Sequence, residues 1–375
     1  MKRHRSENTF ASVYAAAAVS LAYIFLVFFG TGRQPSIRKG MIEAARLMAR
    51  AEAAIRDCRA RSGVPVDEKS DPNRTGLIGL ETSPITTSLG NLAAKRTSTN
   101  PNFAGLMVRL FREAGAREGD VVAVGASSSF PALIVATLSA ARVMELRPLV
   151  ISSLGASEWG ANIPAFNWLD MEECLRTSGL LDITPIALAM GGDEDLGRDM
   201  TPEARDLLRA RIKGSGVPFL EKSGLRANVE ERLRLYDAAA GGRPVKAFVN
   251  IGGSWANIGT NPEVLKLQPG LVRDVFVPPL EERGVLQAMA ARRVPVIHLL
   301  NLRRLAERYG LPWNPKPLPG PGEGGLDQRA GKPGKAFILA SAIYIILIAI
   351  AARSMLRRRA RPGRAWISRA DGEKY

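Results

Sequence analysis

Four short segments rich in Gly, Ser and Asn each follow an apolar run that the sequence predicts as a strand. Glycine lets a ligand approach the backbone closely, and hydroxyl groups together with the amides at a helix start hold anions. Turn and capping chemistry explains any one segment equally well. Ligands bind open α/β sheets at the carboxyl ends of the strands, however, so four such segments on one edge predict a binding site. Its expected ligand-binding residues are Ser129, Ser153, Ser157, Asn162, Ser254 and Asn257.

Ser127 is a candidate nucleophile. It lies in Gly-Ala-Ser-Ser-Ser (125–129), which resembles a G-x-S-x-G elbow except that Ser129 replaces the last glycine. The chain order Ser127, then Asp193 or Asp195, then His298 is that of α/β-hydrolase triads, and the other histidine, His4, lies in the N-terminal tail. His298 also lies within an apolar strand pattern, where a hydrogen-bonded core histidine is the alternative. Ser127, His298 and Asp193 are therefore the catalytic candidates of a serine-hydrolase hypothesis.

A polar stretch at residues 81–102 precedes the alternating region and carries Thr86, Thr87, Lys95 and Arg96. Cationic groups among hydroxyls and amides suit a carboxylate or a phosphate, so these four residues join the expected ligand-binding set. The alternative is a polar surface loop whose side chains cap the next helix.

The sequence predicts neither a cofactor nor a metal. It has no G-x-G-x-x-G followed by a ribose-binding acid, no Walker loop and no cysteine–histidine pair with zinc spacing. Cys58 and Cys174 are the two cysteines, and both a bridge and two independent thiols remain open.

The elements that must position these residues alternate along the chain. Apolar strands are predicted at 120–124, 148–151, 183–189, 245–251 and 294–299, separated by helices such as 103–114, 131–144, 202–213 and 227–240. The fold class expected is α/β: a mainly parallel sheet with helices on both faces, bracketed by two transmembrane helices.

The bracketing prediction rests on two uncharged apolar runs. Residues 10–29 are long enough to cross a bilayer, and residues 336–352 suffice with little tilt. Basic flanks at both ends of the chain favour cytoplasmic termini, with the central part outside the cytoplasmic membrane. A cleaved signal peptide is the weaker alternative, because a small-x-small cleavage pattern is missing.

The expected organisation follows from these runs. It comprises a basic tail (1–9), a transmembrane helix (10–29), an amphipathic helix with its linker (30–69), an extracytoplasmic α/β domain (70–310), a Pro/Gly-rich tether (311–335), a second transmembrane helix (336–352) and a basic tail (353–375).

The net charge of +16 comes from 52 Lys and Arg against 36 Asp and Glu. Half of this excess lies in residues 1–9 and 353–375, where it suits anionic lipid headgroups. No aromatic stacking pattern accompanies it, so nucleic acid is not an expected partner. The remaining basic excess could attract a polyanion outside the cell.

Several segments resemble the poly-γ-glutamate system protein family, membrane proteins associated with bacterial poly-γ-glutamate ligases. They are SPITTSLGNLAAKRTSTNPNFAGL (83–106), GDVVAVGASSSFPAL (119–133), PLVISSLGASEWGAN (148–162), NWLDME (167–172), FVNIGGSWANIG (248–259) and VPVIHLLNLRRLAERYGLPWNPKPLPGPGEG (294–324). The resemblance brings no catalytic residues. It implies an accessory protein that binds or guides poly-γ-glutamate during synthesis or export, with the membrane and the synthase membrane complex as partners.

Two other functions remain open at this point. One is a membrane-anchored serine hydrolase or transferase that acts on the polymer through Ser127 and His298. The other is a binding domain for free glutamate or a related small acid.

Overall fold

The computed structural model describes residues 14, 16–24, 35–182, 184–325 and 335–359. Its contacts divide the chain into two compact units, Pro35–Arg329 and a second unit formed by Met1–Gln34 with Ala330–Tyr375. The larger unit holds all the strands of the described chain.

A seven-stranded sheet in the order β6-β5-β2-β1-β7-β9-β8 forms the centre of the larger unit. All neighbours pair in parallel except β8, which is antiparallel to β9 at one edge. The predicted α/β class with a mainly parallel sheet is therefore confirmed. The strands are β1 Val121–Ser127, β2 Arg147–Ser153, β5 Ala187–Ala189, β6 Phe219–Leu220, β7 Val245–Ile251, β8 Gly270–Val272 and β9 Val296–Leu299.

Every residue of β1 is buried, as a strand covered on both faces requires. Its even-numbered side chains, such as Val124, point into one core, and Val121 and Ala123 point into the other. This alternation continues across the sheet, because Gly125 pairs with Asn250, and Asn250 pairs with His298.

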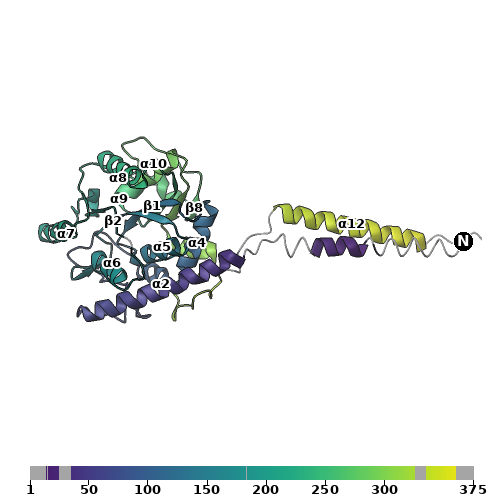
Figure 1. Ribbon diagram of the computed structural model, residues 1–375, viewed down its shortest axis with the longest axis horizontal. Helices are drawn as coiled ribbons and strands as arrows, with labels where there is room; N and C mark the ends of the chain where they lie inside the picture. The colour runs from purple at the N-terminus through teal and green to yellow at the C-terminus, as the bar shows by residue number, and fades with distance from the viewer. Residues whose placement is uncertain (1–13, 15, 25–34, 183, 326–334, 360–375) are drawn as a thin grey trace, which may run out of the picture. The chain divides into compact units, whose positions relative to one another are not determined.

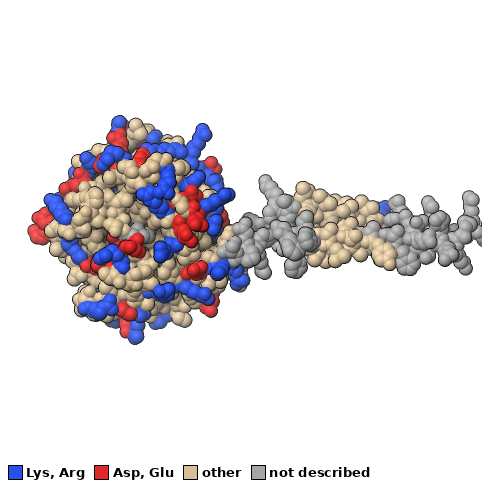
Figure 2. Space-filling model, in the orientation of Figure 1, with Lys and Arg blue, Asp and Glu red and all other residues tan. Residues whose placement is uncertain are grey.

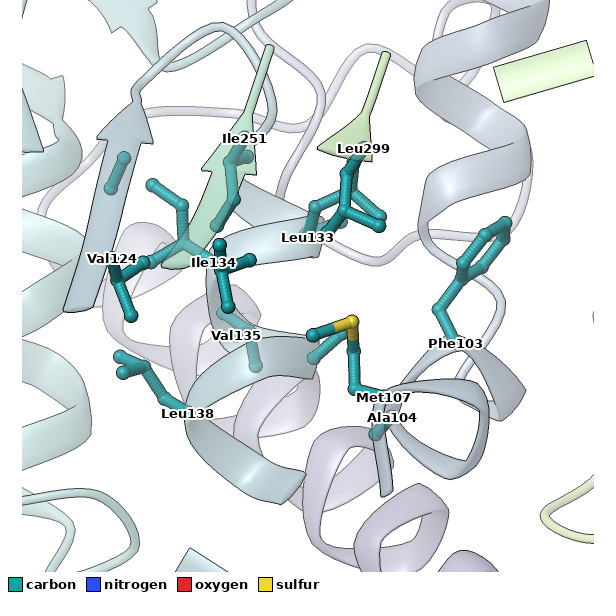
Figure 3. Close-up of a cluster of buried hydrophobic side chains, with 14 of the residues drawn as sticks. Phe103, Ala104, Met107, Val124, Leu133, Ile134, Val135, Leu138, Ile251 and Leu299 are labelled. Atoms are coloured by element: carbon teal, nitrogen blue, oxygen red, sulfur yellow. The ribbon is translucent and has the colours of Figure 1, made fainter. Parts of the chain in front are cut away.

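Helices cover both faces of the sheet (Figure 1). On one face α2 (Pro35–Arg61), α4 (Asn102–Glu113) and α5 (Pro131–Val143) pack on one another, and α5 packs on β1 and β2. Figure 3 shows their apolar contacts, in which Leu133 and Ile134 of α5 meet Val124, Ile251 and Leu299 of the sheet. The other face carries α8 (Leu225–Ala240), α9 (Trp255–Ile258) and α10 (Val285–Ala291).

The remaining elements begin where the local sequence caps them. Asn167 and Asp170 form a capping box that starts α6 (Trp168–Thr177), and Thr201 with Pro202 starts α7 (Pro202–Gly214) as predicted. The others are α3 Leu92–Ser98, α11 Leu302–Tyr309, the 3-10 turns η1 Asp193–Asp195 and η2 Pro262–Lys266, and the short pair β3 Asn162–Ile163 and β4 Phe166–Asn167.

A disulfide joins Cys58 of α2 to Cys174 of α6, with Cα atoms 6.1 Å apart. The sequence left open whether these two cysteines form a bridge or remain independent thiols, and the structure has the bridge. The bridge fixes the C-terminal half of the long helix α2 against the main body of the unit.

Residues 311–325, the first part of the predicted tether, are held against the larger unit. The buried Asn102 donates from Nδ2 to the Gly320 carbonyl and accepts at Oδ1 from the Gly322 amide. The Asn314 amide donates to Thr97 Oγ1 at 2.8 Å. The Pro/Gly-rich sequence signals an irregular path, which here lies on the surface of the domain.

The second unit contains helical residues 16–24 and the helix α12 (Lys335–Arg359). Tyr23 stacks on Tyr344 with ring centroids 4.2 Å apart, and Ser20 and Ser341 hydrogen-bond to these two hydroxyls. Much of the first predicted span, including 10–13 and 25–29, lies outside the described residues, whereas residues 336–352 lie in α12. Over the part of the chain that the structure describes, no helix combines the length and the apolarity that crossing a membrane requires.

Candidate functional site

The strand order reverses between β1 and β7. From β1 the chain continues to β2, β5 and β6 on one side, and it then returns to β7 on the other side. Ligand sites of doubly wound sheets lie at such a switch point, at the carboxyl ends of the strands. Here these ends are Ser127 of β1 and Ile251 of β7. The parallel pairing also places the loops after β2 and β5 at the same edge, as the sequence predicts.

Two buried asparagines with unpaired polar atoms mark this switch point. Neither amide atom of Asn257 has a hydrogen-bond partner in the described structure, and Asn250 Oδ1 also has none. The Asn257 amide lies over Gly125, the residue that pairs with Asn250, so the two side chains are neighbours. Buried polar atoms without partners are costly, and a bound ligand or water is their usual explanation. We call Ser127, Asn250, Asn257 and His298 the switch-point site.

His298 belongs to this site through Asn250. Its Nδ1 lies 3.1 Å from Asn250 Nδ2, which also donates to the Gly252 carbonyl at 2.9 Å. Burial lowers the pKa of His298 to about 4, so the imidazole is neutral at pH 7. Because the amide donates to Nδ1, the ring carries its proton on Nε2.

The three catalytic candidates are not joined to one another. Ser127 Oγ accepts from the Ser129 amide, His298 faces Asn250, and the exposed Asp193 donates its amide to Asp199. Ser127 and His298 lie on the same face of the sheet, on strands that are separated by β7. Through Asn250, His298 is in register with Gly125, which is two residues before Ser127. Standard strand spacing then puts their Cα atoms about 12 Å apart.

A buried ionic network lies beside the switch-point site. Asp195 Oδ2 accepts from Arg232 Nη2 at 2.5 Å and from Asn228 Nδ2 at 3.0 Å, and its Oδ1 contacts Ser153 Oγ at 3.4 Å. The Arg232 and Asp195 side chains are 0% and 1% exposed. Arg232 Nη1 has no partner among the described residues. We call these residues the Asp195 network.

The positions of α8 and α9 bring the network next to the switch-point site. Tyr236, one turn beyond Arg232 on α8, donates to the Val124 carbonyl of β1 at 2.9 Å. Arg232 therefore lies about one turn away along α8, and α9, which carries Asn257, contacts both α8 and η1. No sequence pattern indicates a role for Arg232 or Asn228, because α8 has the pattern of an ordinary amphipathic helix.

Lys95 forms a third polar cluster at the same edge. Its Nζ donates to the Ser129 carbonyl, lies 2.7 Å from Ser157 Oγ and stands 4.0 Å above the centre of the Phe130 ring. Ser129 Oγ accepts from the Ser157 amide at 2.9 Å. Burial lowers the pKa of Lys95 to about 7, and the charge of Glu158 opposes this shift.

Most of the other predicted ligand-binding residues hold the loops together. Asn162 bonds the backbone of Leu80 and the hydroxyl of Thr86, and Arg96 donates to the Ser70 and Lys69 carbonyls. The Thr87 methyl packs where a Cβ on Gly155 would lie. Ser254 precedes α9 without capping it through its side chain. Of the predicted set, Asn257 is the residue whose buried side-chain polar atoms have no partner in the described chain.

Within the described ranges, no group of three or more His, Cys, Asp or Glu side chains is arranged to hold a metal ion. The chain matches no protein-family model, no curated protein and no solved structure. Inference about its function therefore rests on its own residues.

Proposed function

We propose that the chain is a membrane-anchored binding protein of the poly-γ-glutamate system type. Its α/β domain would lie outside the cytoplasmic membrane and bind the glutamyl units of the polymer at the switch-point site, with Arg232 of the adjacent Asp195 network as a further ligand. The observation that carries this proposal is the set of unpaired buried atoms: both amide atoms of Asn257, Asn250 Oδ1 and Arg232 Nη1.

These atoms match a γ-glutamyl unit chemically. Asn257 Nδ2 and Arg232 Nη1 are donors that suit a carboxylate, and charge-assisted bonds from arginine are the stronger kind. Asn250 Oδ1 and Asn257 Oδ1 are acceptors that suit an amide N–H. A γ-linked glutamyl unit offers one carboxylate and one amide N–H, so it satisfies both groups.

The surface charge favours an internal site over an electrostatic track on the face shown in Figure 2. Lys and Arg are interspersed with Asp and Glu over this face of the domain. Mixed charges of this kind give little net attraction for a long polyanion. The specificity would then come from the buried polar atoms.

Two features support the proposed location. The Cys58–Cys174 bridge suits an oxidising compartment, where disulfides form and persist. In the second unit, the paired side chains Tyr23, Tyr344, Ser20 and Ser341 are polar, whereas the exposed ones include Leu21, Ile343, Ile346 and Ile350. Helices that associate in lipid show this arrangement, with polar contacts between helices and apolar side chains outside.

Calorimetry on the full chain in detergent micelles tests the proposal. A γ-linked glutamyl oligomer should bind and an α-linked oligomer of equal length should bind less, with affinity falling as salt rises. Asn257→Ala should weaken binding by about tenfold or more, since it removes two hydrogen bonds to the ligand. The matched control Asn73→Ala, on the loop that bonds Pro315, should bind normally.

The enclosed position of Asn257 also favours a second candidate, a small acidic solute such as free glutamate. The same titrations separate the two. Tight binding of the monomer without binding of the oligomer would establish the small-solute function. No binding of either at low ionic strength would overturn the proposed function.

A further inference from the structure

Lys95 and Ser157 are the closest pair of a nucleophilic hydroxyl and an amine in the described structure, with 2.7 Å between Nζ and Oγ. Among the described residues Lys95 has no ion pair, and it is 1% exposed. Ser157 is 6% exposed, so both members of the pair are buried. Lys95 lies on α3, Ser157 lies on the loop after β2, and neither residue is part of the switch-point site. Ser129, which contacts both, lies on the loop after β1.

The two loops fix this pair from both sides. Ser129 accepts from the Ser157 amide at Oγ and from Lys95 at its carbonyl, so one residue positions both partners. A Cβ on Gly160 would lie 2.9 Å from Ser129 Cα and from the Ser157 carbonyl, so the loops pack as closely as they do because residue 160 is glycine. This preorganisation is what a catalytic pair requires.

The protonation state of the amine also fits. Burial lowers the pKa of Lys95 to about 7, so a large fraction of the amine is unprotonated at neutral pH. An unprotonated Nζ donates one N–H to the Ser129 carbonyl and accepts the Ser157 hydroxyl proton with its lone pair. A base with a pKa near the working pH is the efficient choice for general base catalysis.

We propose that Ser157 and Lys95 form a serine–lysine dyad that transfers acyl groups from amides or esters. This activity is independent of binding at the switch-point site, and it differs from the arrangement of Ser127, Asp193 and His298 considered above.

The reaction needs no reagent other than the acyl donor and water or an amine. Ser157 Oγ forms a bond to the carbonyl carbon while its proton moves to Lys95 Nζ. The resulting ammonium lies beside the new oxyanion and stabilises it. When the C–N or C–O bond of the donor breaks, Lys95 returns the proton to the leaving atom. Water or an amine then attacks the Ser157 ester, Lys95 takes its proton, and that proton goes back to Ser157 as the acyl group leaves.

An alkyl fluorophosphonate probe tests the dyad on the full chain in micelles. The probe should label Ser157, as located by peptide mass spectrometry, with loss of fluoride from phosphorus. The labelling rate should rise with pH through about 7, where Lys95 loses its proton. Lys95→Met should slow labelling by about 100-fold or more. Ser157→Ala should abolish it at this peptide.

Matched controls separate chemistry from folding. Lys266→Met replaces an exposed lysine of η2, and Ser62→Ala replaces an exposed serine directly after α2; both should label like the wild type. Mapping of the wild-type chain requires no variant, so a misfolded mutant leaves the test intact. An unlabelled Ser157 in the folded wild type at pH 9, or labelling at an undiminished rate in a folded Lys95→Met chain, overturns the proposal.

Discussion

The amide of Asn257 fills the space in which a side chain on Gly125 would begin. A Cβ at residue 125 would lie 2.6 Å from both terminal atoms of that amide. Glycine inside a central strand weakens the strand, and it often marks a site where another group approaches the backbone closely. Here that group is the Asn257 side chain. The strand and the switch-point site therefore depend on each other at this contact.

Gly125→Ala should destabilise the protein by about 1–3 kcal/mol, because the added methyl displaces Asn257. Chemical denaturation of the full chain measures this change. The double variant Gly125→Ala with Asn257→Ala should recover part of the loss, since the displaced side chain is gone. Equal stabilities for the single and double variants would show that the contact carries no coupling.

Asn257→Ala alone should leave the free energy of unfolding unchanged or raise it slightly. The substitution removes two buried polar atoms that have no partner in the described structure, so no hydrogen bond is lost. Glutamyl-oligomer binding should fall in the same variant. Gain of stability with loss of binding is the pattern of a functional residue, whereas loss of stability would indicate a structural one.

Sequence patterns predicted the centre of the sheet well and its edges poorly. The strands β1 and β7 are long apolar runs, and buried parallel strands have that signature. The edge strands β6 and β8 have two and three residues, too few to show a period, and they were missed. A hydrophobic pattern is detectable only over a run of several residues, so the long central strands were predicted and the short edge strands were not.

The candidate site was also predicted only in part. The glycine and serine loops were predicted because turn residues follow apolar strands, and Asn257 was among them. Arg232 was missed, because it lies 37 residues from its partner Asp195, on a helix with an ordinary amphipathic pattern. Sequence order suggested Ser127 with His298, but the register of β1, β7 and β9 separates them. No local sequence pattern predicts which residues from distant parts of the chain lie together.

Asp195→Asn should destabilise the protein by about 3–5 kcal/mol, because it leaves the Arg232 charge buried without compensation. Asparagine suits the test because Asp195 has a φ of 61°, a conformation that asparagine tolerates. The control is Glu221→Gln, which breaks an exposed pair with Arg209 and should cost less than about 1 kcal/mol. A small effect of Asp195→Asn would mean that Arg232 finds another partner.

His298 should make stability depend on pH between about 4 and 6.5. Its pKa is lowered to about 4 in the folded chain, whereas the unfolded histidine has the ordinary value of 6.5. As pH falls through this window the unfolded state binds a proton that the folded state does not, so stability falls, by about 3 kcal/mol in total. His298→Gln should reduce that slope, as measured by denaturation at several pH values. Identical slopes in both proteins would contradict the buried neutral imidazole.

The bridge between Cys58 and Cys174 should contribute about 3–5 kcal/mol, because it closes a loop with a sequence separation of 116 residues. Replacing both cysteines with serine, or adding a reductant, should lower the denaturation midpoint by similar amounts. A thiol assay on the unfolded, unreduced chain should detect no free thiol. Two reactive thiols in protein purified without reductant would contradict the bridge.

Asn102 should control the order of residues 311–325. Its Oδ1 accepts from the Gly322 amide at 2.7 Å, so Asn102→Ala should speed hydrogen exchange at that amide, which mass spectrometry or NMR detects. Asn73→Ala is the matched control, because Asn73 bonds only the Pro315 carbonyl in this segment and leaves Gly322 protected. The Glu323 carboxylate, which accepts from the Gly320 amide, is the competing support. If exchange is unchanged in Asn102→Ala and faster in Glu323→Gln, the Glu323 carboxylate rather than Asn102 holds this segment in place.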